Sequence, residues 1–158
     1  TTGGVGEGDR DLVLAAWSRL GVTVRFRRVR VSPGKNSCMG ARGGQAYFGL
    51  PGHPRGARLI FQELVVPRLF LLQGLPAVPP PAVRSILGRS LNKPRGLCKA
   101  VPGSLRQDGT QVVFDPAPGG EAGRLERLGK ACGYIMLDER TERVAAGEPV
   151  EVRLHDLP

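Results

Sequence analysis

Glycine and aspartate residues are concentrated at the start of this chain, in a spacing that suits the binding of an anion. Residues 1–11 are TTGGVGEGDRD, with four glycines in six positions and carboxylates at Asp9 and Asp11. Glycines let a backbone turn with positive φ and expose its N–H groups, which together can cradle a phosphate. Carboxylates in the same loop could hold the divalent metal that often accompanies phosphorylated ligands. A glycine turn followed by an ordinary helix N-cap is the alternative interpretation.

Two further loops carry turn residues next to possible anion contacts. Pro33, Gly34 and Lys35 form a Pro-Gly turn that ends in a lysine. Later, residues 51–54 (PGHP) combine a glycine with a proline that suits the first turn of a helix. If strands lead into these loops, the loops could gather beyond the strand ends, where open α/β sheets bind their ligands.

The elements that position these loops follow from the apolar periodicity of residues 1–75, which alternates α and β. A helix capped by Asp11 and stopped by Gly21 is predicted from an apolar stripe that places Trp17 in the core. Residues 22–26 predict a strand, with a bulge near Arg27 and Arg28.

The second loop is followed by a hairpin-like stretch through Gly43 and Gly44, and a strand over residues 45–50 then enters the third loop. A long helix is predicted from about Arg55 to Leu72, with a kink at Pro67.

A proline-rich segment, residues 76–82, is predicted to be a semi-rigid linker. Beyond it, residues 83–158 are mostly β in pattern and predict a small β-barrel or β-sandwich. The candidate elements are strands at 83–91, 96–101, 111–114, 133–137 and 150–154, and a short helix at about 122–131.

The composition limits the partners. A formal charge of +9, from 23 basic and 14 acidic residues, favours anionic ligands. Nucleic acid is disfavoured because aromatic residues, which could stack on bases, are only 5% of the chain. Cys38, Cys98 and Cys132 form no CxxC pair, which argues against a zinc site and favours a reducing, cytoplasmic compartment. No apolar run is long enough to span a membrane. Because the chain does not begin with Met, we expect it to be cut from something larger.

The three loops and the tail together resemble the molybdopterin molybdotransferases, the family of MoeA and the gephyrin E domain. The resemblance rests on residues 2–11, 33–35 and 48–54, and on the tail at 128–135 and 142–151. It implies that residues 1–75 are the later part of a three-layer α/β molybdopterin-binding domain. Residues 83–158 would be the family's C-terminal β domain.

The resemblance also implies an activity, the metal-dependent insertion of molybdate into adenylylated molybdopterin with release of AMP. Mg²⁺ would be the cofactor, and adenylylated molybdopterin and molybdate the substrates. The family implies a homodimer whose cleft borrows residues from the partner subunit, and a molybdoenzyme or an adenylyltransferase as a further partner. This chain alone would then be an incomplete portion of the enzyme.

Roles for individual residues follow from the same resemblance. Asp11 and Asp9 would ligate Mg²⁺ or position the attacking water, and Lys35 would face molybdate or phosphate. The loops that bind the pterin or its phosphate would be formed by Thr2, Gly3, Gly4, Gly6, Gly8, Pro33, Gly34, Gly52, His53 and Pro54.

Four positions depart from the family pattern. Gly6 stands where the family usually has Ser, Ser32 where it has a lysine, His53 where it has Asn, and residues 122–124 replace a serine-containing loop. These changes leave room for a divergent paralogue or a non-catalytic scaffold. An adenylyltransferase of the MogA type is a further alternative, although the β tail and the Pro-Gly-Lys turn argue against it.

Overall fold

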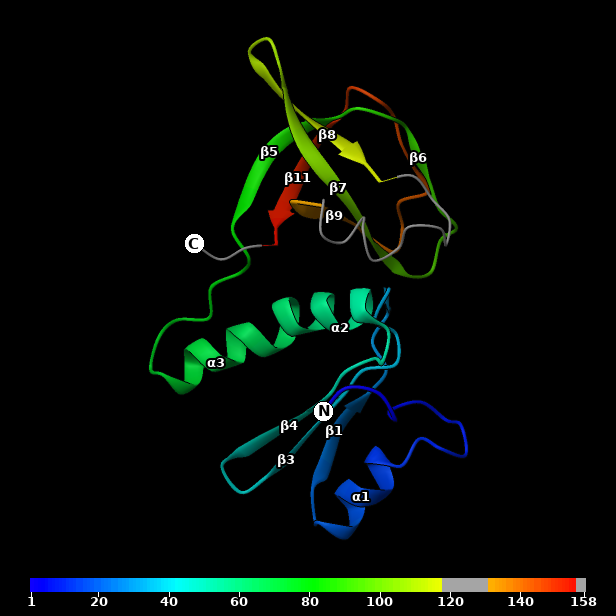
Figure 1. Cartoon of the computed structure of the whole chain (residues 1–158), viewed down its shortest axis with the longest axis vertical. Helices are drawn as coiled ribbons and strands as arrows, with labels where there is room; N and C mark the ends of the chain where they lie inside the picture. Colours follow the sequence, from blue (N-terminus) through cyan, green and yellow to red (C-terminus); the bar gives the residue numbers. More distant parts are fainter. Residues whose placement is uncertain (118–130, 156–158) are drawn as a thin grey trace. The chain divides into compact units, whose positions relative to one another are not determined.

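The computed structural model describes residues 1–117 and 131–155. The chain divides into two compact units, Thr1–Val78 and Pro79–Pro158, and the division lies inside the proline-rich segment (Figure 1). The helix predicted at about 122–131, the departure at 122–124 and the first residues of the tail motif lie outside the described residues.

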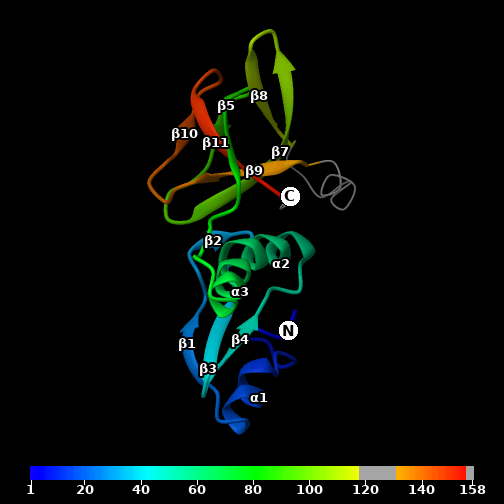
Figure 2. The same ribbon diagram turned by 90° about the vertical axis from the view of Figure 1, so that its left-hand side faces the viewer.

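The sheet of the first unit has three antiparallel strands in the order β1-β3-β4, which lie side by side in Figure 2. They are β1 (Thr23–Arg27), β3 (Cys38–Arg42) and β4 (Gln45–Gly49); a short strand, β2 (Val31–Ser32), precedes β3. Gly43, with a φ of 54°, closes the predicted hairpin between β3 and β4.

The predicted bulge in the first strand is displaced. The register shifts between Val24 and Phe26, which pair with the adjacent residues Gly40 and Met39, so that Arg25 is the extra residue. Arg28 adopts a φ of 66° where the chain leaves the strand, so the predicted position of the bulge is occupied by a turn.

Helix α1 (Val13–Arg19) covers one face of this sheet. Trp17 is buried, as predicted, in a cluster with Val5, Val22 and Cys38, and its ring meets Tyr47 edge to face at 6.1 Å. The predicted N-cap is wrong. Leu12 occupies that position without a side-chain cap, because the carboxylate of Asp11 is turned back to the amide of Gly8.

The long helix of the first unit is built of three segments rather than one. Helix α2 (Pro54–Ile60) passes into a π-helical segment (Phe61–Val65) and then into α3 (Val66–Leu72). Where the sequence predicts a kink at Pro67, the structure has a π-helical segment that ends at Val65, two residues before the proline. Because proline has no N–H to donate to the preceding turn, the ladder of hydrogen bonds has to adjust there.

The second unit is a barrel, which decides between the two predicted forms. Its strands are β5 (Ala82–Leu87), β7 (Cys98–Asp108), β8 (Gln111–Pro116), β9 (Gly133–Leu137) and β11 (Pro149–Leu154). They follow the order β7-β8-β5-β11-β9, and β9 pairs back onto β7, which closes the sheet. Two short strands, β6 (Leu91–Asn92) and β10 (Arg143–Val144), pair with each other beside it.

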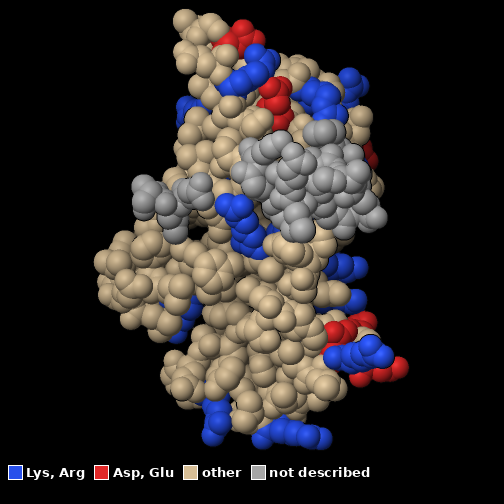
Figure 3. Space-filling model, viewed as in Figure 1, with Lys and Arg blue, Asp and Glu red and all other residues tan. Residues whose placement is uncertain are grey.

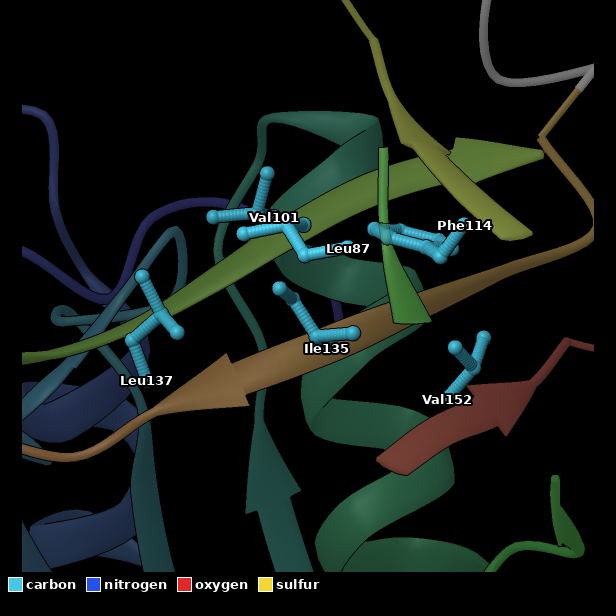
Figure 4. Close-up of a cluster of buried hydrophobic side chains, with 6 residues drawn as sticks. All are labelled: Leu87, Val101, Phe114, Ile135, Leu137 and Val152. Carbon is cyan, nitrogen blue, oxygen red and sulfur yellow. The ribbon is translucent and has the colours of Figure 1, made fainter. Parts of the chain in front are cut away.

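The barrel encloses one apolar core (Figure 4), and every strand of the closed sheet contributes to it. Its buried members are Leu87, Val101, Phe114, Ile135, Leu137 and Val152. Phe114 and Val152 have no solvent-exposed surface.

Asp138 closes the turn after β9 and makes the stability of the barrel depend on pH. Its Oδ1 accepts hydrogen bonds from the amide and hydroxyl of Thr141 and from the amide of Arg140. The bonds from Thr141 and then from Arg140 lower the pKa of this carboxyl below its ordinary value of 3.8. The carboxylate therefore stabilises the fold above the ordinary value, and the stabilisation is lost as pH falls through the lowered pKa.

We expect Asp138→Asn to lower the melting temperature at pH 7 and to melt like the wild type once the pH is below the lowered pKa. Thermal unfolding between pH 7 and pH 2 measures this difference. Asp9→Asn is the control, because Asp9 has no bonding partner among the described residues. An equal loss at every pH would show that the carboxylate charge is not what stabilises the turn.

Two properties of the surface bear on partners. Lys and Arg side chains are spread in separate small groups over the face seen in Figure 3, with no single continuous basic patch there. In the part of the chain that the structure describes, no helix is both long and apolar enough to cross a membrane.

Candidate functional site

The glycine loop (residues 1–11) is hydrogen-bonded through its backbone to Leu50, the residue directly before the third loop (residues 51–54). Leu50 accepts a hydrogen bond from the amide of Gly3 at 2.9 Å and donates one to the carbonyl of Thr1 at 2.9 Å. Thr2 and Leu50 form a parallel bridge, in contrast to the antiparallel ladders of the sheet. A β-carbon on Gly52 would lie 3.4 Å from the Cα of Gly3, so the two predicted loops pass each other in contact.

The loop itself is closed by Asp11. Its Oδ2 accepts a hydrogen bond from the amide of Gly8 at 2.9 Å, while its own amide donates to the carbonyl of Gly8 at 2.8 Å. A second closure runs from the amide of Val13 to the carbonyl of Gly4, whose φ is 65°. Asp11 is half-buried and Asp9 is exposed. The position of the Asp11 carboxylate is thus fixed by a hydrogen bond within the glycine loop itself.

The Pro-Gly-Lys turn is fixed against α2. Gly34 is buried with a φ of 130°, and a β-carbon there would lie 2.8 Å from Cδ1 of Ile60. The hydroxyl of Ser37 donates to the carbonyl of Gly34 at 2.6 Å. Pro33 is half-buried, while Lys35 at the end of the turn is exposed. The cation is therefore accessible on a turn that cannot shift freely.

This turn also meets the glycine loop, and here the structure adds a residue that the sequence did not single out. A β-carbon built on Gly6 would lie 2.6 Å from Oδ2 of Asp11 and 3.5 Å from Nδ2 of Asn36. An exposed ion pair between Arg28 and Glu7, 3.5 Å long, joins the glycine loop to the residues directly after β1, and the amide of Arg28 donates to the carbonyl of Ser37 at 2.7 Å. Asn36 follows Lys35 directly, and only the folding of the two loops against each other shows where its amide lies.

The remaining predicted residues lie at the start of α2. Pro54 occupies the first turn, as predicted. His53 is exposed and extended at the N-cap, and its carbonyl accepts a hydrogen bond from the amide of Ala57 at 3.0 Å. Its side chain makes no capping hydrogen bond.

The carboxylates can supply only part of a metal site. No group of three or more His, Cys, Asp or Glu side chains lies close enough to hold a metal among residues 1–117 and 131–155. Asp11 and Asp9 offer two carboxylates two positions apart, one of them held in place. Mg²⁺ is commonly bound by one or two carboxylates with phosphate oxygens and water completing the shell. Two carboxylates are the number that such a site takes from the protein, and too few for an all-protein cage.

The second unit has a hollow of its own, of about 310 Å³, which none of the predicted site residues lines. It is lined by residues of β9, of β11 and of the segment between them, and its charged lining residues are Asp138, Glu148, Glu151 and Arg153.

Comparison with known proteins follows the division into units. Residues 1–70 match the family model described as "Probable molybdopterin binding domain", and residues 84–154 match "MoeA C-terminal region (domain IV)". The chain belongs to the molybdopterin molybdenumtransferase family. All the site residues predicted from the sequence lie within the first of the two matched segments.

Curated relatives cover nearly the whole chain. A molybdopterin molybdenumtransferase of Staphylococcus epidermidis is 28% identical over 98% of this chain, and molybdopterin molybdenumtransferase 2 of Mycobacterium tuberculosis is 30% identical over 96% of it. The chain spans 37% and 38% of the length of these relatives. A molybdopterin biosynthesis MoeA protein of Pyrococcus horikosii, 27% identical, superposes with a TM-score of 0.78 over 92% of this chain and 35% of its own.

Proposed function

We propose that this chain takes part in molybdenum cofactor biosynthesis, as a portion of a molybdopterin molybdotransferase. The reaction would insert molybdate into adenylylated molybdopterin and release AMP. The observation that supports this most directly is the meeting of the three loops in the first unit, with the carboxylate of Asp11 held over Gly6. The match of residues 1–70 to a probable molybdopterin binding domain supports molybdopterin as the class of ligand.

Each of the three loops would bind a different part of the ligand. Backbone N–H groups of the glycine loop would face the phosphate or the pterin, since the loop has little side-chain bulk between Gly3 and Gly8. Lys35 would offer a compact positive charge to molybdate or phosphate from its fixed turn. The turn at Gly52, His53 and Pro54 would bound the other side. Asp11 would position the water that attacks the adenylate, because its own position is set by Gly8.

Asp11 and Asp9 would hold Mg²⁺ together with oxygens of the ligand. When bound, the ion would supply positive charge that neutralises the phosphate. The exposure of Asp9 and the single hydrogen bond that Asp11 receives leave carboxylate oxygens available for this role.

The finer features of the family are part of the same proposal. The antiparallel sheet of the first unit would belong to a three-layer α/β domain, and the complete enzyme would be a cytoplasmic homodimer. A subunit interface is supported by α3, which has no buried residue and exposes Leu69, Leu71 and Leu72. A molybdoenzyme or an adenylyltransferase would be the further partner. The MogA-type alternative is not favoured, because residues 84–154 match the MoeA C-terminal region.

Titration of this chain with adenylylated molybdopterin in the presence of Mg²⁺ tests the proposal. We expect saturable binding, and we expect Lys35→Ala to weaken it roughly three- to tenfold because one charge-assisted contact is lost. Lys99→Ala is the matched control, since Lys99 is an exposed lysine of β7 in the second unit. Absence of saturable binding, or equal affinity of the two lysine variants, would contradict the proposed site.

A further inference from the structure

The backbone of Asn36, directly after the second loop (residues 33–35), is fixed by its neighbours, while its side chain makes no hydrogen bond to the described residues. The residues on either side are tied down, because the carbonyl of Lys35 accepts from the amide of Val29 at 3.0 Å and that of Ser37 from the amide of Arg28 at 2.7 Å. The Asn36 side chain itself is exposed and has no hydrogen-bond partner within the described ranges. A backbone fixed on both sides reduces the entropy that this side chain would lose on binding a ligand.

The side chain lies beside the carboxylate of Asp11, where the second loop meets the glycine loop. The place that a β-carbon of residue 6 would occupy is 2.6 Å from Oδ2 of Asp11 and 3.5 Å from Nδ2 of Asn36. At 2.6 Å the carboxylate itself takes up this place, so glycine at residue 6 allows the Asp11 carboxylate and the Asn36 carboxamide to approach the same point of the loop.

The two groups have complementary hydrogen-bonding properties. An ionised carboxylate only accepts hydrogen bonds, so Asp11 alone would repel an anionic oxygen that came beside it. A carboxamide donates two hydrogen bonds without carrying a charge, and it can bind such an oxygen without a net ionic attraction to Asp11. The resemblance predicts a serine at residue 6, whose hydroxyl would be a donor. Asn36 brings a donor to the same place from the neighbouring loop.

We propose that Asn36 is a ligand-binding residue of this site, and that its carboxamide donates a hydrogen bond to an anionic oxygen of the adenylylated molybdopterin that comes beside the carboxylate of Asp11. This inference rests on the proposed function. It assigns to Asn36 the donor that this chain lacks at residue 6.

The test combines a binding titration with the side-chain amide signals of the ¹⁵N-labelled chain. Asn36 and Asn92 are the only asparagines, so Asn36→Asp and Asn92→Asp assign both signals by their disappearance. Asn92 is exposed on β6 of the second unit and is the matched control. On addition of adenylylated molybdopterin and Mg²⁺, the Asn36 signal should shift and that of Asn92 should not. Asn36→Ala should weaken binding roughly tenfold, and Asn36→Asp more, because it adds a second carboxylate.

The backbone amides of Gly4, Gly6 and Gly8 report separately on the proposed function. If these amides shift while the Asn36 signal stays in place, and both Asn36 variants bind like the wild type, then the glycine loop binds the ligand and the role of Asn36 is refuted. If none of these amides shifts at saturating ligand, the proposed function fails for this chain and the role of Asn36 fails with it.

Discussion

Asp11→Asn is expected to lower the affinity for adenylylated molybdopterin in the presence of Mg²⁺ on the order of 10- to 100-fold, with little change in stability. Asparagine keeps the shape of the side chain and retains an oxygen that can accept the 2.9 Å hydrogen bond from Gly8. The loop should therefore stay closed. What is lost is the negative charge that would hold the ion.

Asp11→Ala separates the two roles of this side chain. It removes the charge and also the acceptor that closes the loop, so it should lower both affinity and melting temperature. Glu142→Gln is the control for a lost carboxylate, because Glu142 forms an exposed ion pair with Arg95 in the second unit. If Asp11→Asn binds like the wild type and only Asp11→Ala binds weakly, the side chain serves only to close the loop, and its charge has no role in binding.

The same residue shows what sequence patterns can and cannot reveal. Aspartate immediately before a helical stripe predicts an N-cap. In the structure, the amide of Gly8 donates a hydrogen bond to the carboxylate of Asp11. The N-cap residue is Leu12, whose side chain makes no capping hydrogen bond. The carboxylate could accept from the amide of Gly8 or from an amide in the first turn of the helix. Which of these it meets depends on the path of the loop. The glycines allow many paths, so the local pattern does not decide between them.

Strand boundaries in the barrel illustrate a second limit. The strand that contains Val101 is expected to end there because Pro102 and Gly103 suggest a turn, yet β7 continues to Asp108. Gly103 does not form a turn. It allows β7 and β8 to approach closely, because a β-carbon there would clash with the carbonyl oxygen of Asp115. The need for glycine arises from the partner strand, which a local pattern does not contain.

Local signals were sufficient where the structure depends on neighbours in the sequence. The hairpin at Gly43, the burial of Trp17 and the irregularity before Pro67 all follow from turn chemistry, periodicity or a missing donor. Asn36 is the opposite case. Its place beside Gly6 is created by two loops thirty residues apart in the chain, so spacing alone gives no reason to select it.

The largest expected effect on stability is that of Phe114→Ala, which should destabilise the barrel by about 3–5 kcal/mol. Phe114 is completely buried in the core of the second unit and lies over Gly103. A β-carbon at Gly103 would be 2.5 Å from Cζ of the ring, so the ring fills the space that a side chain there would need. Glycine has nothing to move into the cavity left by the substitution, and a cavity that cannot collapse costs most.

Urea unfolding followed by hydrogen exchange of the β7 and β9 amides measures this loss in the barrel. Val112→Ala is the matched control, because Val112 is two residues away on β8 and 38% exposed; it should cost less than about 1 kcal/mol. Fluorescence of Trp17, the single tryptophan, reports on the first unit. If Phe114→Ala costs no more than Val112→Ala, the barrel is not held together by the core that β5, β7, β8, β9 and β11 enclose.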